Sequence, residues 1–164
     1  TPVYAAYSPG IPVCGSTPPP PTKPPTKPPA TPKTREQKAV DWAKSQKGST
    51  AYLGLCDRFV ANAYGRTKSG YLTAGTHLAA MAIRRKMFYY DYNAPAGSLV
   101  FFFPGPKNGW SGHVMISLGN GKAISSEHWV GSKRYGVGEV SIRNKTNFGI
   151  YAGWAPANSE WAGR

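Results

Sequence analysis

Cys56 and His113 are the two residues whose types and positions could carry out nucleophilic chemistry. Apolar residues recur three, four, seven and eight positions after Cys56, a spacing that predicts an amphipathic helix with Cys56 in its first turn. The unpaired amides and the dipole at a helix N-terminus favour a thiolate over a thiol. His113 opens a run of alternating apolar residues, which predicts a strand that begins with an imidazole. A cysteine hydrolase requires these two groups, a thiol and a base that can reach it.

Each of the two residues also has a purely structural interpretation. A cysteine on the apolar side of a helix is most often a small buried hydrophobe, and a histidine at the start of a strand is most often a surface or satisfied polar residue. In an oxidising compartment Cys56 could instead pair with Cys14, the other cysteine of the chain, which would leave no nucleophile. With two cysteines and three scattered histidines, the sequence offers no pattern for a zinc site, and we expect neither a metal nor a cofactor.

The elements that must position Cys56 and His113 are predicted to be helices first and strands afterwards. Periodicity and capping residues predict helices at residues 35–46, 56–65 and 77–86. Alternation and turn residues predict strands at 99–103, 113–118, 122–126, 138–143 and 149–154. This order is typical of an α+β domain. In the second strand the alternation places Val114 and Ile116 toward the core and His113 on the opposite face.

The composition restricts the partners of the protein. The chain has 164 residues, with 20 Lys and Arg against seven Asp and Glu, and a formal charge of +13. Such a charge indicates a polyanionic partner, which could be nucleic acid, an anionic membrane or a bacterial wall polymer. No stretch approaches the roughly 20 apolar residues that a membrane-spanning helix needs.

A proline-rich segment divides the chain. Residues 16–34 contain nine of the sixteen prolines and three lysines. Because proline fixes φ and removes backbone donors, we expect an extended, semi-rigid linker here. Residues 1–15 form a tail to which the sequence assigns no function, and residues 35–164 have the composition and length of one domain.

Three sequence blocks of this domain resemble those of the NlpC-type cell-wall cysteine peptidases, the NlpC and p-sixty superfamily of papain relatives. Leu55-Cys56-Asp57-Arg58-Phe59-Val60 resembles the helix that opens with the nucleophile. Gly97-Ser98-Leu99-Val100-Phe101-Phe102 resembles the family's Gly-Asp-Leu-Val-Phe-Phe strand, and residues 112–122 resemble the hairpin that carries the base. Residues 151–156 are similar to the C-terminal segments of actinobacterial members.

The resemblance implies a fold and an activity. It implies a papain-like domain in which N-terminal helices pack on a small antiparallel sheet, with Cys56 as nucleophile and His113 as base. Its substrates would be peptidoglycan stem peptides, most often cut between D-glutamate and the diamino acid. A secreted monomer held on anionic wall polymers by its basic surface would fit this activity.

The third catalytic position is left open by the sequence. The family commonly has a polar residue, often histidine, twelve positions after the base, and this position is Ser125 here. Ser125 could accept the imidazole N–H but supplies no negative charge, whereas Glu127 on the same strand face could supply it. A two-residue hairpin loop would place His128 opposite His113, and one bulge would bring Ser125 and Glu127 to the catalytic face instead. We favour Ser125 or Glu127, with His128 as a surface residue.

Two further residues are candidates for substrate binding. The family's Asp-Cys-Ser-Gly is replaced by Leu-Cys-Asp-Arg at positions 55–58, so Asp57 should make a substrate contact that differs from the family's. Tyr52 resembles an upstream tyrosine that borders the site in the family, although simple packing explains it equally well. His77, the remaining histidine, is expected to be a helix residue without a partner.

Two other function classes compete with a hydrolase. A degenerate member of the family could bind wall polymer without cutting it, and the missing third histidine favours this alternative. A nucleic-acid binder would fit the charge and the 13% aromatic content, but the chain contains no recognised nucleic-acid motif.

Overall fold

The computed structural model describes residues 29–84, 89–143 and 145–157, and the compact unit that contains the helices and strands begins at Pro32. The predicted tail at residues 1–15 and most of the predicted linker lie outside the described residues, and so does Cys14. The described part of residues 16–34 includes Thr34, which accepts the N–H of Gln37 at 3.2 Å and caps the first helix.

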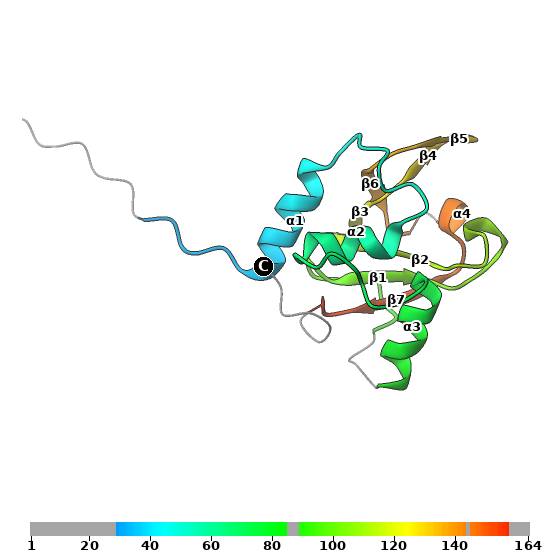
Figure 1. Cartoon of the computed structure of the whole chain (residues 1–164), viewed down its shortest axis with the longest axis horizontal. Coiled ribbons are helices and arrows are strands. Elements are labelled where there is room, and N and C mark those ends of the chain that lie inside the picture. The colour runs from blue at the N-terminus through cyan, green and yellow to red at the C-terminus, as the bar shows by residue number, and fades with distance from the viewer. Residues whose placement is uncertain (1–28, 85–88, 144, 158–164) are drawn as a thin grey trace, which may run out of the picture. The chain divides into compact units, whose positions relative to one another are not determined.

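Three helices precede the sheet, as the sequence predicts (Figure 1). They are α1 (Arg35–Ser45), α2 (Cys56–Ala63) and α3 (Ala74–Ile83). The third helix begins three residues before its predicted start, because Thr73 and Thr76 each accept the other's backbone N–H and form a capping box. In the described part of the chain, no helix has the length and hydropathy to cross a membrane.

Five antiparallel strands form the main sheet, in the order β6-β3-β2-β1-β7. Their bounds are β1 (Leu99–Phe102), β2 (His113–Gly119), β3 (Lys122–Ser125), β6 (Gly138–Ser141) and β7 (Tyr151–Ala155). Four short elements were not predicted: the hairpin strands β4 (His128–Val130) and β5 (Lys133–Tyr135), the 3-10 turn η1 (Pro106–Asn108) and the helix α4 (Lys145–Phe148). The predicted α+β class is confirmed.

Both faces of the main sheet are buried, which corrects one prediction. On one face Val114 and Ile116 pack in a core with α1, α2 and α3. On the other face Met115 and Phe102 belong to a second core with Phe148. His113 lies on the face opposite Val114 and Ile116, as predicted, but this face is covered by the second core and does not point away from the interior. His113 is only 3% exposed.

A bulge sets the register between β2 and β3. Ile116 lies opposite Ile124, and the register shifts by one residue between Ser117 and Gly119. The structure thus has the register in which Ser125 shares a strand face with Met115 and His113, and not the one that places His128 opposite His113.

Candidate active site

Cys56 is the first residue of α2 and a free thiol that is partly exposed. The helix starts after a turn in which Leu55 donates its N–H to the carbonyl of Tyr52 at 2.9 Å. Phe59 and Val60, both fully buried, fix the helix on the sheet. The backbone amides of Val114 and Asp57 lie near enough to the sulfur to lower the pKa of the thiol. Cys56 therefore lies where α2 begins and β2 begins, beside the peptide bond that joins His113 to Val114.

The pKa of the Cys56 thiol is raised to about 12, chiefly by burial. The amides of Val114 and Asp57 lower this pKa, and the nearby charges of Asp57 and Glu127 raise it. Desolvation of a thiolate therefore outweighs the helix N-terminus. We predicted from the helix position alone that the thiolate would be favoured, and that prediction is wrong for the resting protein. Attack by this thiol requires a base that removes its proton.

His113 is held between an aromatic ring and a hydroxyl. Its imidazole stacks on Phe148 with ring centroids 4.8 Å apart, and its Nε2 lies 2.8 Å from Ser125 Oγ. Burial lowers the His113 pKa to about 4, with a smaller lowering by Arg134 and an opposing effect of Glu127. The ring is therefore neutral at neutral pH. When Nε2 carries the proton and donates it to Ser125, Nδ1 keeps a lone pair that can accept a proton.

Ser125 and Glu127, the two candidates for the third position, have different surroundings. Ser125 is fully buried and contacts His113 directly. The Glu127 carboxylate pairs with Arg134 of β5 and accepts the Gly54 N–H at 3.3 Å. Glu127 thus acts on His113 through its charge alone, without a hydrogen bond to the imidazole.

His128 takes no part in this arrangement. Its Nδ1 lies 2.7 Å from the carbonyl of Gly136, and its ring stacks on Tyr135. These contacts hold His128 of β4 against the end of β5 and the residue that follows it. His128 is partly buried by them, so it is not the plain surface residue that we expected.

Asp57 forms a buried pair with His77, a contact that the sequence analysis missed. His77 Nδ1 lies 2.6 Å from Asp57 Oδ1, and His77 is fully buried between the stacked ring of Tyr71 and the edge of Phe101. The prediction that His77 lacks a partner is wrong. His77 precedes Met81 by one helical turn, on the apolar stripe of α3. That position could have indicated burial, and a buried histidine needs a polar partner.

Tyr52 packs between α1 and α2. Its ring makes edge contacts with Trp42 and Phe59, with centroids 5.9 and 5.2 Å apart, and its hydroxyl accepts from the Asn62 amide at 3.1 Å. The packing interpretation accounts for all of these contacts. A role of Tyr52 in substrate binding stays a prediction.

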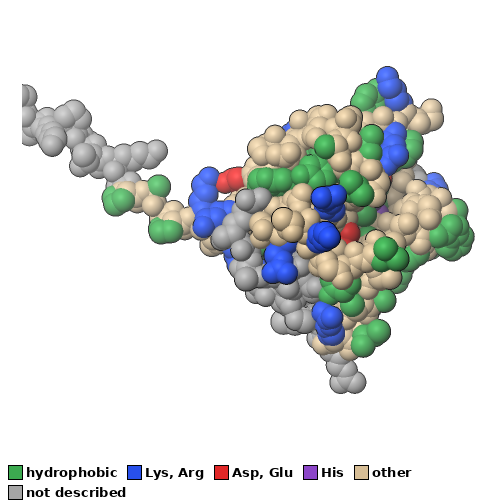
Figure 2. All heavy atoms as spheres, in the orientation of Figure 1, with side chains coloured by type: hydrophobic (Ala, Val, Ile, Leu, Met, Phe, Trp, Pro, Cys, Tyr) green, Lys and Arg blue, Asp and Glu red, His purple; other side chains and the backbone are tan. Residues whose placement is uncertain are grey.

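A cleft of about 390 Å³ opens beside Cys56. Its walls come from α2, from the loop that precedes α3 and from the start of α3, and they include Asp57, Arg58, Lys68 and Tyr71. In the orientation of Figure 1, Figure 2 shows several Lys and Arg side chains on the face where α2 lies. The predicted substrate residue Asp57 therefore lies at the wall of this cleft, although its carboxylate is held by His77.

Within the described ranges, no group of three or more His, Cys, Asp or Glu side chains could hold a metal ion. Comparison of the chain with models of known protein families gives no match, and comparison with curated proteins gives no significant match.

Proposed function

We propose that residues 35–164 form a papain-like cysteine hydrolase of the NlpC type that cuts peptide bonds in peptidoglycan stem peptides. The observation that carries the proposal is the position of Cys56 at the start of α2, with the Val114 amide near enough to lower the pKa of its thiol. The residue before Val114 is His113, whose imidazole contacts Ser125. In this proposal Cys56 supplies the nucleophile, His113 the base and Ser125 the group that orients the base.

The Cys56 thiol and the His113 imidazole are both uncharged at rest, so in the proposed reaction the thiol proton is transferred during the attack. As Cys56 Sγ attacks the scissile carbonyl, His113 takes the thiol proton and becomes an imidazolium, which Ser125 continues to orient. The imidazolium then gives this proton to the leaving amine, and a thioester remains on Cys56. Water deprotonated by His113 hydrolyses the thioester and restores the thiol. The N–H of Cys56, at a helix start where it has no helical acceptor, is suited to stabilise the oxyanion.

The basic charge fits a secreted protein that works on the bacterial wall. Wall polymers carry phosphates, and a formal charge of +13 would hold the protein near them. We propose that the protein acts there as a monomer and without a cofactor.

A second candidate is a binding module that retains the fold without cutting. The observation that favours it is the Cys56 thiol itself, whose pKa is raised to about 12 while Ser125 supplies no negative charge to stabilise an imidazolium. In such a module the uncharged Cys56 thiol and His113 imidazole would have no catalytic role.

Reaction with a substrate-like electrophile distinguishes the two candidates. A stem peptide that carries a chloromethyl ketone in place of the scissile bond should alkylate Cys56 of the full chain near neutral pH, as located by peptide mass spectrometry. His113→Ala should slow this alkylation by at least about two orders of magnitude, the scale expected for loss of a general base. Alkylation at the same rate in both proteins would favour the binding module.

A further inference from the structure

The Asn108 side chain joins the loop before β2 to the end of α4. Its Nδ2 donates to the carbonyls of Phe103 and Phe148, at 2.8 and 3.0 Å. Its Oδ1 accepts the N–H groups of Gly105 and Gly112, at 3.0 and 3.1 Å. One amide therefore connects the residue that follows β1, the residue that precedes η1, the residue that precedes β2 and the residue that ends α4.

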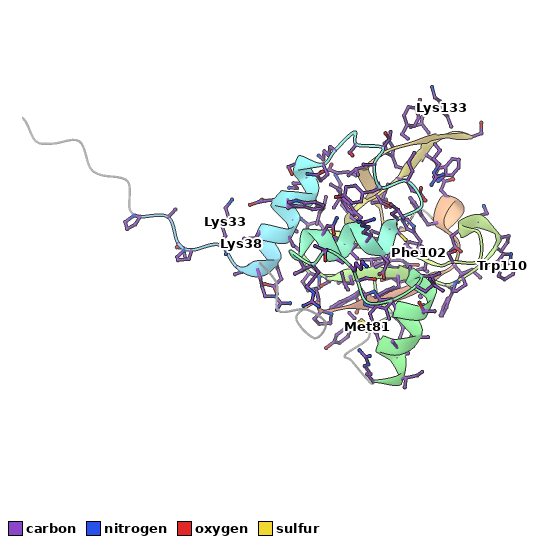
Figure 3. The ribbon with its side chains drawn as sticks, in the orientation of Figure 1. Lys33, Lys38, Met81, Phe102, Trp110 and Lys133 are labelled. Carbon is purple, nitrogen blue, oxygen red and sulfur yellow. The ribbon has the colours of Figure 1, made fainter. Side chains whose placement is uncertain are left out.

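These four bonds use the whole hydrogen-bonding capacity of the Asn108 amide. A side-chain amide has two N–H donors and one oxygen with two lone pairs. Asn108 is partly buried, whereas Trp110 of the same loop is 71% exposed and lies at the outer edge of the domain (Figure 3). The Asn108 amide thus has no donor or acceptor left for a ligand, which indicates a role in positioning other residues.

One of the bonded groups leads directly into the proposed base. Gly112 has a φ of +72°, in the left-handed region that favours glycine, and it is the residue before His113. Glycine permits many backbone directions at this point, so the bond from its N–H to Asn108 Oδ1 limits the path by which the chain enters β2. The same path places the Val114 amide, which lies near enough to Cys56 to lower the pKa of its thiol.

A second bonded group carries the ring on which the base stacks. Phe148 is 3% exposed, and its ring stacks on the His113 imidazole with centroids 4.8 Å apart and planes 20° apart. Because α4 has only four residues, its own helical bonds are few. It lies beside the loop between β1 and β2 (Figure 1), where Asn108 donates to the Phe148 carbonyl. This bond therefore holds the ring against the imidazole.

We propose that Asn108 is a positioning residue for His113 and fixes its imidazole from two directions. One direction is the backbone at Gly112, and the other is the ring of Phe148. Ser125 holds the imidazole at Nε2, and Asn108 fixes the backbone before it and the ring that covers its face. A general base must lie within hydrogen-bond reach of the proton that it removes, so a small displacement of the imidazole would slow the reaction. The inference rests on the proposed function for the role of His113 as base, but the position of the ring is argued from the described contacts alone.

Nuclear magnetic resonance of the full chain tests the position of the imidazole without turnover. The stacked Phe148 ring should shift the imidazole protons of His113 upfield, and His113→Asn identifies these signals among those of the three histidines. Spectra are compared above the ordinary imidazole pKa of about 6.5. Asn108→Ala should move the His113 signals downfield, toward their positions in Phe148→Leu, which lacks the aromatic ring. The signals of His77 and His128 should stay in place.

The same variant tests the reaction with the stem-peptide chloromethyl ketone that probes Cys56. In this reaction the saturation constant reports binding, and the limiting rate reports alkylation of the bound enzyme. Asn108→Ala should lower the limiting rate by about tenfold, the scale of one or two neutral hydrogen bonds, and leave the saturation constant unchanged. Asn93→Ala is the matched control, because Asn93 is an exposed loop asparagine that bonds through its backbone N–H. It should change neither quantity.

Asn108→Asp tests the same inference if the alanine variant does not fold. Its carboxylate keeps an acceptor for Gly105 and Gly112 but cannot donate to the two carbonyls, so the His113 signals should again move downfield. Signals at the parent positions, an unchanged limiting rate, or a loss that arises in the saturation constant would overturn the inference. Absence of alkylation in the parent chain would instead reject the hydrolase, and the His113 signals would still decide whether Asn108 positions the imidazole.

Discussion

Cys56 and His113 are both uncharged at neutral pH, because burial raises the pKa of the thiol to about 12 and lowers that of the imidazole to about 4. A pre-formed thiolate–imidazolium pair is therefore not the resting state. In the proposed reaction the thiol proton would move to His113 as the sulfur attacks, so the orientation of the ring would matter more than its charge at rest. Ser125 provides this orientation through its contact with Nε2.

The low pKa of His113 predicts a loss of stability in mild acid. The unfolded imidazole titrates near its ordinary value of 6.5 and the folded one near 4. Between these values the unfolded chain binds a proton that the folded chain does not, so stability is fully present above pH 6.5 and declines as the pH falls toward 4. We expect His113→Asn to lose less stability than the parent between pH 7 and pH 5, as measured by urea unfolding. An equal loss in both proteins would contradict the burial of an uncharged His113.

Ser125→Ala should impair catalysis more than Glu127→Gln does. The alanine removes the only described partner of His113 Nε2, and loss of one such hydrogen bond corresponds to about a tenfold decrease in kcat/KM. Glu127→Gln removes a charge but keeps a side chain that can accept from Arg134 and Gly54. Steady-state hydrolysis of a soluble stem peptide gives the comparison. A larger decrease in kcat/KM for Glu127→Gln than for Ser125→Ala would indicate that Glu127 is the third catalytic residue.

At the scale of elements, α2 and α3 are joined by the Asp57–His77 pair. The pair is buried, links residues twenty positions apart and lies directly behind the cleft. The first turn of α2 carries both Cys56, the proposed nucleophile, and Asp57, the acidic member of this pair. The pair therefore fixes the start of α2 against α3.

His77→Phe should destabilise the domain strongly. It leaves the Asp57 carboxylate buried without its partner, and removal of one member of a buried pair costs about 3–5 kcal/mol of unfolding free energy. Combining it with Asp57→Leu should recover part of this loss, because no buried charge then remains. Denaturant unfolding of the single and double variants checks both statements. Additive losses in the double variant would show that the two side chains are not coupled.

The elements that carry Cys56 and His113 could be predicted because their apolar periodicity is strong. The α2 stripe and the alternation of β2 are determined by burial against the same core, so the local pattern contains the information. The three-residue strands β4, which is partly buried, and β5, which is exposed, have no such pattern, and neither has the four-residue α4. Their existence depends on tertiary contacts such as the one between His128 and Gly136.

The candidate site was predictable only in part for a similar reason. Sequence order and spacing indicated Cys56, His113 and two candidates for the third position. The bulge after Ser117 sets the register that excludes His128, and of the two candidates Ser125 is the one in contact with His113. Desolvation, which reverses the expected effect of the helix on the thiol, depends on the whole packed interior. The Asp57–His77 pair joins two helices that no local pattern relates.

At the scale of the whole molecule, the proline- and lysine-rich segment should hold the protein on the wall without affecting its chemistry. A truncated chain should start at Pro32 and not at Arg35, because Thr34 caps α1 and Lys33 pairs with Asp41. We expect equal turnover of a soluble peptide by the full and truncated chains. Retention on intact walls should be weaker in the truncated chain, and added salt should weaken retention of both, since the Debye length is about 8 Å at physiological ionic strength. An unfolded or inactive truncated chain would contradict the assignment of wall retention to the segment before Pro32 and of catalysis to the rest of the chain.

The most direct test of the account is the release of stem-peptide fragments from purified peptidoglycan, measured by mass spectrometry for the parent chain and for Cys56→Ala. Alanine suits the first turn of α2 and fills a partly exposed position, so the variant should remain folded with an unchanged circular dichroism spectrum. The account predicts that the parent releases fragments and that the variant releases none above background. Release by Cys56→Ala at the parent rate, or no release by the parent, would contradict it.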